Sequence, residues 1–460
     1  MSLLSSIQSA RSGLSTSSTA IETTAHNVAN VSTDGFHRRR VERGQPEQIN
    51  RKGVHVGQGV HATRVRRATD DLLGTRMFEQ MGVAGKSNWT SKSLQQVEAA
   101  FNESDSSGIA ETLEQLFDSM SRATSDPSDS GLRMSVVRKG EIFARAVNRT
   151  SDSLSDAMSD FESDMEEMMG NVNSIAKNLS QVNTSINAVG DSLGAGDLLD
   201  SRDRLVDQLA REVGGQVDYA PNGTATVFIA GHAIVSGVSH REMSLGTDAN
   251  GEPVVEMSVD SGNVVMTDNM MGKMGGLVQA RDLVKGYLED LDTFASDFSD
   301  AINTQHGSGF DVTGAGGSDM FSYTAGQASS TLEFDSTLLS DPNGLAFSGS
   351  ATGGVGNDDN LKNLLSLQSS NIFNAGTTNS GEFAANLISE VGNDISKFSG
   401  LAAAEGEHLS DLEGMMDSLT GVNLDQEATD LIEFQAAYQA AAKVIQAANS
   451  LIDYMIETLA

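Results

Sequence analysis

The last segment of the chain, LDQEATDLIEFQAAYQAAAKVIQAANSLIDYMIETLA at residues 424–460, carries the clearest helical pattern in the sequence. Its apolar residues recur every three or four positions, which is the spacing of one face of an α-helix. The face comprises Leu431, Phe434, Tyr438, Ile445, Ile452, Met455 and Leu459. A helix of this length extends about 55 Å at about 1.5 Å per residue. So long an apolar face needs a partner, because a lone helix would leave it in water.

The matching pattern lies at the other end of the chain, over residues 3–29. Its apolar positions follow the three-and-four spacing of a modest heptad repeat. They are Leu3, Ile7, Leu14, Ile21 and Val28. We therefore predict that the two end helices pair as a coiled coil, with the rest of the C-terminal face buried against other copies of the chain. An ordinary coiled coil confined to one molecule is the alternative.

The first helix is predicted to stop within HNVANVSTDGF, residues 26–36. Asparagine and glycine tolerate the left-handed backbone that ends a helix and turns the chain. The turn residues of interest are Asn27, Asn30, Gly35 and Phe36. Valines spaced by glycines over residues 54–60 then indicate short strands or turns.

The interior of the chain changes its periodicity twice. Residues 86–212 are mostly helical, residues 215–267 alternate around a Pro-Asn-Gly turn as a hairpin does, and helix returns after them. The predicted fold is mainly α with a small β insert (α+β), elongated and multi-domain. We expect a terminal coiled-coil domain at 1–85 plus 405–460, a helical-bundle middle domain at 86–212 plus 268–404 with a loop-rich segment at 306–380, and an outer β domain at 213–267.

Composition excludes several kinds of protein. The chain has 460 residues and a net charge of −33, which argues against nucleic acid as a partner. It has no cysteine, so disulfides and thiolate metal sites are excluded. We expect no membrane span, because no apolar run approaches the ~20 residues required. No cleaved secretion signal is expected at the N-terminus either, so the protein stays in the cell or leaves by another route.

Charge is unevenly distributed along the chain. Residues 1–76 hold 11 basic and 6 acidic residues, whereas the remainder is strongly acidic. The basic run FHRRRVER at 36–43 is interpreted as a solvated or subunit-facing strand rather than a nucleic-acid patch. The eight histidines form no HExxH motif, and neither a phosphate loop nor a nucleophile elbow occurs. We therefore expect no enzyme activity, no cofactor and no metal site.

Both ends and the middle of the chain resemble a known group. SGL and NVANVSTDGF near the start, with NLDQEATDLIEFQAAYQAAAKVIQAANSLIDYM at the end, are similar to the axial proteins of the bacterial flagellum, which include rod, hook and hook-associated proteins. The central DLLDSRDRLVDQLA and GGLVQARD segments resemble the hook-associated protein 1 family. The chain is short for that family, so we expect an outer domain of longer relatives to be missing.

The resemblance implies a structural role in motility. Proteins of this family form the junction between hook and filament, leave the cell unfolded through the flagellar type III secretion system, and assemble outside it through their terminal helices. The partners implied are other copies of the chain, the hook protein, a second hook-associated protein or filament protein, and an export chaperone. A hook or rod protein is the alternative function, followed by a secreted adhesin.

Overall fold

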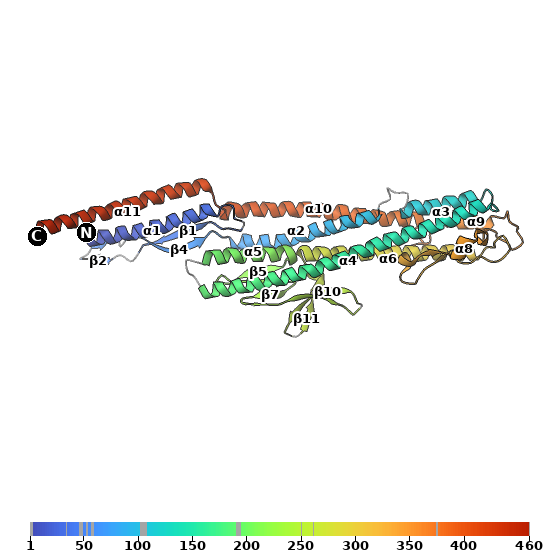
Figure 1. The fold of residues 1–460 in the computed structure, drawn as a ribbon, viewed down its shortest axis with the longest axis horizontal. Helices are drawn as coiled ribbons and strands as arrows, with labels where there is room; N and C mark the ends of the chain where they lie inside the picture. Colours follow the sequence, from blue (N-terminus) through green and yellow to red (C-terminus); the bar gives the residue numbers. More distant parts are fainter. Residues whose placement is uncertain are drawn as a thin grey trace. The chain divides into compact units, whose positions relative to one another are not determined.

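The structure is a computed structural model that describes residues 3–33, 35–45, 49–51, 54–56, 59–101, 108–189, 195–249, 251–260, 262–373 and 376–459 (Figure 1). Its fold is mainly α with small antiparallel sheets, which confirms the predicted fold class. The chain divides into two compact units. The first comprises Met1–Ala84, Met169–Gly272 and Glu405–Ala460, and the second Gly85–Met168 and Lys273–Ala404. The strands of the β insert thus fall within the first unit, and the three-domain division stays a prediction.

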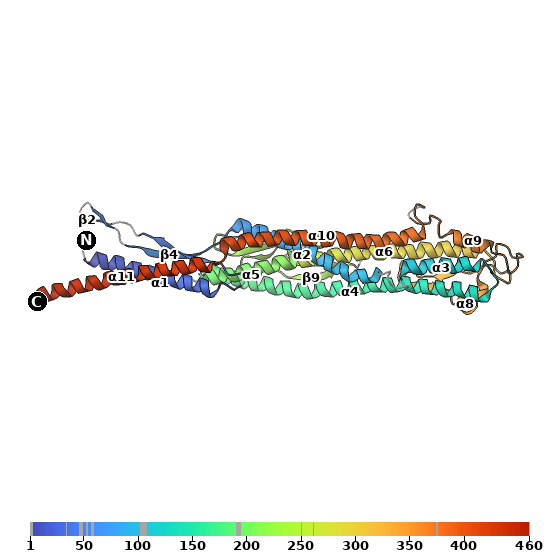
Figure 2. The same ribbon diagram turned by 90° about the horizontal axis from the view of Figure 1, so that it is seen from above.

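Two terminal helices and a hairpin make up one end of the first unit. Helix α1 (Leu3–Ala29) and helix α11 (Leu424–Leu459) lie side by side, as the two end patterns predicted (Figures 1 and 2). Strands β1 (Arg39–Gly44) and β4 (His61–Arg67) pair antiparallel and pack on α1. The short strands β2 (Ile49–Arg51) and β3 (Val54–Val56) pair with each other.

The β insert follows helix α5 (Ala195–Val213) and forms two antiparallel sheets. The first sheet has the order β5 (Gln216–Tyr219), β6 (Ala225–Ile229), β7 (His232–Ser236), β8 (Ser239–His240). The second has the order β11 (Gly262–Val265), β10 (Pro253–Val259), β9 (Met243–Thr247), followed by the short helix η2 (Thr267–Asn269). Asn183 fastens the last turns of α4 (Ser130–Val189) to this insert by donating to the carbonyls of Ala225 and Gly237 at 2.8 and 2.7 Å.

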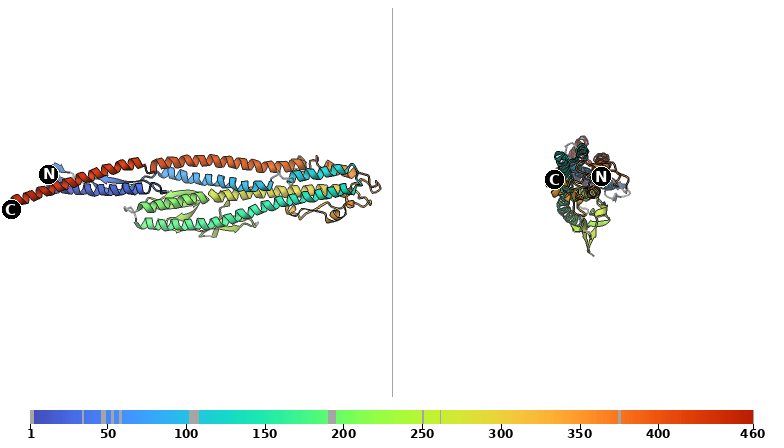
Figure 3. Two further views of the ribbon diagram at one scale, coloured as in Figure 1. Left: turned by 45° about the horizontal axis from the view of Figure 1, so that its top comes forward. Right: turned by 90° about the vertical axis from the view of Figure 1, so that its right-hand side faces the viewer.

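Long helices dominate the second unit (Figure 3). They are α2 (Asp71–Glu98) from Gly85 on, α3 (Ile109–Ala123), α4 up to Met168, α6 (Gly272–Gly307) from Lys273 on, and α10 (Ser380–Thr420) up to Ala404. The short helix η1 (Ala99–Phe101) follows α2. Tyr287 on α6 donates to Asp394 on α10 at 2.9 Å, which holds these two helices together.

The segment predicted as loops and short strands, residues 306–380, also contains short helices. Its elements are β12 (Phe321–Ser322), α7 (Ala328–Thr331), β13 (Glu333–Phe334), α8 (Ser336–Ser340), η3 (Pro342–Gly344) and α9 (Asp359–Ser366). Asp335 begins α8 by accepting from the backbone amides of Thr337 and Leu338, both at 2.9 Å. Helices α7 and α8 are too short to show apolar periodicity, which is why the sequence pattern missed them, whereas Leu361 and Leu364 of α9 do follow a helical spacing that was overlooked.

A cluster of phenylalanines forms the core of the second unit. Phe294 on α6 stacks with Phe298, Phe373 and Phe383 at ring-centroid distances of 6.1, 5.5 and 5.7 Å. Phe143 on α4 meets Phe294 edge-on at 6.1 Å. Because one ring contacts four others, Phe294 joins α4, α6, α10 and the segment after α9 in a single core.

His306, at the end of α6, is fully buried and binds two parts of the loop-rich segment through its ring nitrogens. Its Nδ1 faces the Ser318 carbonyl at 2.5 Å, and its Nε2 accepts from the Ala346 amide at 2.8 Å. A carbonyl only accepts and an amide only donates, so His306 must be neutral with its proton on Nδ1. Burial lowers the pKa of His306, and the hydrogen bond to Ser318 offsets only part of that effect.

We expect the second unit to lose stability as the pH falls below the ordinary histidine pKa of 6.5. The unfolded chain binds the proton first, because the folded pKa is the lower of the two, so His306 contributes fully only above that pH. The free energy of unfolding should then fall by up to about 1.4 kcal/mol per pH unit. The measurement is the difference in the free energy of unfolding between the wild type and His306→Gln at each pH, since glutamine cannot take up the proton. A difference that stays constant from about pH 8 to 5 would contradict this role.

Candidate assembly site

In one chain, the predicted apolar face of α11 is only partly covered. Leu431, Phe434, Ile445 and Ile452 are half-buried, and Ala448 is 5% exposed. Tyr438 and Met455 lie at 37% and 48% exposure. The side chain of Leu459 is outside the described residues. The assembly role of this face stays a prediction.

Helix α1 packs on two partners rather than one. Its predicted apolar residues Leu3, Ile7, Leu14 and Ile21 are half-buried, and Val28 is 39% exposed. The most buried positions are instead small or polar: Ala10, Thr16, Ala20, Thr24 and Asn27. The buried face is therefore rotated from the predicted seam towards the β1–β4 hairpin.

Polar side chains of α1 hold that hairpin through its backbone. Thr16 donates to the carbonyl of Val60 at 3.1 Å, and Ser12 accepts from the amide of Val60 at 3.3 Å. Backbone N–H and C=O groups at a strand end that are buried and have no partner in the sheet need such hydrogen bonds. A pattern search for apolar residues cannot detect this contact, because hydroxyl groups make it.

The turn after α1 brings the predicted turn residues together. Asn27 is 1% exposed; its Oδ1 accepts from the Arg39 amide at 3.0 Å and its Nδ2 donates to the Arg39 carbonyl at 2.9 Å. Asn30 donates to the His26 carbonyl at 2.9 Å and so ends the helix. Gly35 has a φ of 68°, which non-glycine residues rarely adopt, and Phe36 packs against the His26 ring at 5.5 Å. Asp34 lies outside the described residues.

Arg38 ties this turn to the start of α11. Its Nε lies 2.5 Å from Glu427 Oε1, its Nη1 donates to Gln426 at 2.9 Å, and its Nη2 lies 3.1 Å from Asp430. The other Glu427 oxygen accepts from Asn27 Nδ2 at 2.9 Å. The side chains of Arg38 and Glu427 are 6% and 1% exposed. Both ends of the chain therefore meet in one buried ion pair, whose remaining hydrogen-bonding groups are satisfied by neighbours.

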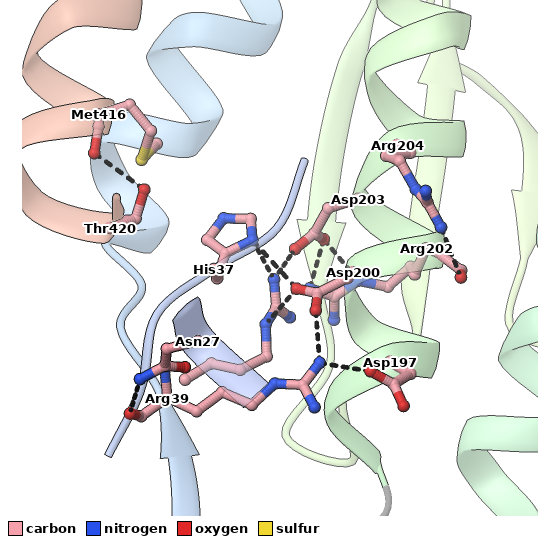
Figure 4. A network of polar contacts seen from close by, with 12 residues as sticks. Asn27, His37, Arg39, Asp197, Asp200, Arg202, Asp203, Arg204, Met416 and Thr420 are labelled. Atoms are coloured by element: carbon pink, nitrogen blue, oxygen red, sulfur yellow. Dashed lines mark hydrogen bonds and ion pairs between the residues drawn. The ribbon is translucent and has the colours of Figure 1, made fainter. Parts of the chain in front are cut away.

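A second cluster binds the base of the hairpin to α5 (Figure 4). Arg39 reaches Asp197 and Asp200 at 2.6 and 2.7 Å, and Arg67 lies 2.9 Å from Asp200. Asp200 also lies 3.1 Å from His37 Nδ1. Burial opposes ionisation of Asp200, but the hydrogen bond from His37 and the charges of Arg67 and Arg39 hold its pKa below the usual value. Asp200 is therefore a carboxylate at neutral pH.

The basic run at 36–43 is thus not a solvated strand along its whole length. Arg38 is 5% exposed and paired with acids of the same chain, and Arg39 is half-buried. The exposed residues of the strand are Arg40 and Arg43. The prediction was wrong for Arg38 and Arg39 because their acidic partners lie more than 150 residues away in sequence, and no local pattern reveals such pairs.

A surface of exposed apolar residues runs along α11. Its members are Ile432, Val444, Leu451, Tyr454, Met455 and Ile456, each at least 47% exposed. Apolar patches of this kind mark interaction surfaces. Among the described residues, no group of acidic or histidine side chains could hold a metal ion. Within that same part of the chain, no helix has the length and hydropathy of a membrane span.

Comparisons with known proteins identify this arrangement. The family model for the flagellar hook-associated protein FlgK helical domain matches residues 94–321. Models for the flagella basal body rod protein and for the flagellar basal body rod FlgEFG protein C-terminal region match residues 7–37 and 414–458. The two terminal helices thus match the rod group, whereas the middle of the chain matches hook-associated proteins.

Relatives match over nearly the whole chain. Flagellar hook-associated protein 1 of Bacillus subtilis is 27% identical over 493 residues, covering 98% of this chain and 97% of that protein. The protein of the same name from Escherichia coli is 25% identical over 544 residues, covering 98% and 99%. Because the second alignment is longer than this 460-residue chain, that relative has segments with no counterpart here.

A solved structure shares the fold. The flagellar hook junction protein FlgK from Burkholderia pseudomallei superposes with a TM-score of 0.67 at 13% identity, covering 75% of this chain and all of that one. Family model, full-length relatives and fold agree. The chain is a member of the flagellar hook-associated protein 1 family, and thus a structural component of the axial part of the bacterial flagellum rather than an enzyme.

Proposed function

We propose that this protein forms the junction between the flagellar hook and filament and assembles there through its terminal helices. The observation that carries the proposal is the half-covered face of α11 beside α1. Leu451, Tyr454 and Ile456 are more than half exposed in a single chain. Burying them against neighbouring copies would supply a hydrophobic driving force that the isolated chain lacks.

The proposal includes export of the unfolded chain through the flagellar type III system to an extracellular position. The composition suits this route, because a chain without cysteine cannot be trapped by disulfides before or after passage. The partners proposed are other copies of the chain, the hook protein, a second hook-associated protein or filament protein, and an export chaperone. The family to which the chain belongs supports these partners.

A hook or rod protein is the second candidate, since both terminal helices match rod-group models. The match of residues 94–321 to the hook-associated helical domain favours the junction. Deleting the gene and examining the cells by electron microscopy separates the two. We expect hooks that lack filaments, with filament protein released into the medium. Loss of the hooks themselves would instead support the second candidate.

Truncating the α11 face should block assembly without unfolding the protein. Ile445→Ala and Ile452→Ala each remove a half-buried side chain whose full burial we assign to the assembled state. Truncating a fully buried isoleucine costs about 2–5 kcal/mol, so incorporation should fall sharply while circular dichroism of the free chain stays near that of the wild type.

Lys443→Ala is the matched control, because Lys443 is exposed on the same helix. The readouts are motility and the amount of the variant found in isolated hook–filament structures. Normal motility and normal incorporation of both isoleucine variants would contradict assembly through α11.

A further inference from the structure

The first unit contains a groove of about 850 Å³ that the terminal helix pair does not explain. It lies between the turn after α1, the first turns of α2, one side of α5 and the last turns of α10. Its walls include the apolar side chains of Phe36, Met77, Met416 and Tyr219. A concave site lined by both polar and apolar side chains, where four segments meet, is suited to receive part of another molecule.

The rim of this groove is acidic. Asp71 and Asp417 are exposed, and Glu413 also lines the groove. Two arginines share the groove but are already engaged: Arg211 pairs with Glu413 at 2.9 Å, and Arg202 binds Asp203 and the carbonyl of Gly223 and stacks on Tyr219. The charge left over is negative, so a cationic occupant fits and an acidic one does not.

The β1–β4 hairpin carries the complementary charge on its outward face. Arg40 and Arg66 are directly opposite each other in the strand register, and both are exposed. Like charges in directly opposed positions destabilise a hairpin unless something nearby compensates them. Glu42 compensates in part, at 3.6 Å from Arg66, but it also pairs with Arg64 at 2.6 Å. The outward face therefore stays cationic.

The inward face of the same hairpin shows what such arginines bind. Arg39 and Arg67, the next opposed pair, bind the row of aspartates on α5. Successive residues of a strand point to opposite faces, so Arg40 and Arg66 are turned away from α5 while that contact holds. They consequently cannot enter the groove of their own chain, which α5 lines.

We infer that the outward arginine face of the β1–β4 hairpin in one copy docks in the acidic groove of a second copy. The end of α11, although exposed and apolar, is a poorer occupant because Asp453 and Glu457 would meet the acidic rim. The charge asymmetry of the sequence agrees with this choice: residues 1–76, which include the hairpin, hold 11 basic and 6 acidic residues, and the rest of the chain is acidic.

This contact is heterologous, because donor and acceptor are different surfaces of the same chain. Each docked copy keeps one free hairpin or groove, so the contact repeats as a ring or an open helical array. The inference rests on the proposed self-assembly and adds to it a second contact between copies, made by charge rather than by the apolar face of α11.

The absence of cysteine from the chain allows a clean cross-linking test. Arg66→Cys and Asp417→Cys are made in separate full-length chains with tags of different mass, mixed under assembly conditions and oxidised. A disulfide requires the two Cα atoms to approach within about 4–7 Å, so a mixed dimer reports that hairpin and groove meet. We expect this dimer only when both variants are present.

In each of two control pairs, one cysteine stays at its position and the other is placed at a different exposed site. Arg66→Cys with Asp260→Cys replaces the groove position by an exposed acid on the β insert, and Arg122→Cys with Asp417→Cys replaces the hairpin position by an exposed arginine on α3. Neither pair should cross-link above the background of the single variants. Circular dichroism checks that each variant is folded.

Light scattering of the same mixtures separates this inference from the proposed function. Assembly into large species without the mixed Arg66→Cys and Asp417→Cys dimer would overturn the hairpin contact and leave self-assembly standing. Failure of the wild-type chain to assemble at all would overturn both. As an independent check, Asp417→Arg should weaken association about fivefold, and Arg66→Asp in the partner chain should restore it. If Asp417→Arg and Arg66→Asp each weaken association and their combination does not restore it, the result would also count against the contact.

Discussion

Arg38→Met is expected to lower the free energy of unfolding of the first unit by about 3–5 kcal/mol. The substitution keeps an unbranched apolar side chain but removes the only cation that contacts Glu427 Oε1 among the described residues. Glu427 is 1% exposed, so its carboxylate would remain buried without a counter-charge. The buried Asn27 amide, which donates to the other Glu427 oxygen at 2.9 Å, carries no charge and cannot compensate it. The measurement is denaturant unfolding followed by circular dichroism.

Three comparisons isolate the effect of the buried pair. Arg64→Met breaks an exposed pair with Glu42 and should cost less than about 1 kcal/mol. Arg38→Met combined with Glu427→Met removes both charges and should recover part of the loss, because no uncompensated ion remains. Trp89 is the single tryptophan of the chain and lies in the second unit, so its fluorescence transition should shift little. A double variant no more stable than Arg38→Met would show that the charge is not what matters.

The same substitution should impair assembly. Arg38 fixes the turn after α1 to the first turns of α11 through Glu427, Gln426 and Asp430. Without it, the hydrogen bond from Asn27 to Glu427 is the polar contact left between the two helices here, and their apolar contacts remain. The chain would then present α11 in more than one position, and fewer copies would offer the geometry that a neighbour needs.

Phe294→Ala should lower the stability of the second unit by about 3–5 kcal/mol. Phe294 is 1% exposed and lies within 6.1 Å, centroid to centroid, of four other phenylalanine rings. Its removal leaves a cavity that α4, α6 and α10 cannot all close at once, since long helices move as rigid bodies. The predicted loss is observed as an earlier Trp89 fluorescence transition in denaturant.

Phe294→Leu serves as the matched control, because it keeps most of the buried volume and loses only the ring contacts. It should cost clearly less than the alanine variant. Lys273 and Lys92 lie over the Trp89 ring at 4.2 and 5.2 Å, so the indole is a local reporter of this unit. Equal losses for leucine and alanine would mean that ring geometry, not volume, determines the stability of this core.

Local periodicity in the sequence determined the long helices and the β insert, but not the short helices of residues 306–380. The three-and-four spacing from Leu431 to Ile452 fixes α11, because a helix must place every such residue on one side. The Pro-Asn-Gly turn at 221–223 fixes the β5–β6 hairpin, where Gly223 adopts a φ of 86°. These features depend only on neighbours a few residues apart, so the sequence alone predicts them.

The tertiary structure alone decided how the polar residues are used. Arg38 and Glu427 are 389 residues apart, and nothing near either one indicates the other. In the sequence, His306 is one of eight histidines with nothing to distinguish it. Only the positions of the Ser318 carbonyl and the Ala346 amide in the fold place its proton on Nδ1. Buried charges and amides are stable only when a matching group is supplied by a distant segment. That match is a property of the folded chain and is not encoded in any short stretch of it.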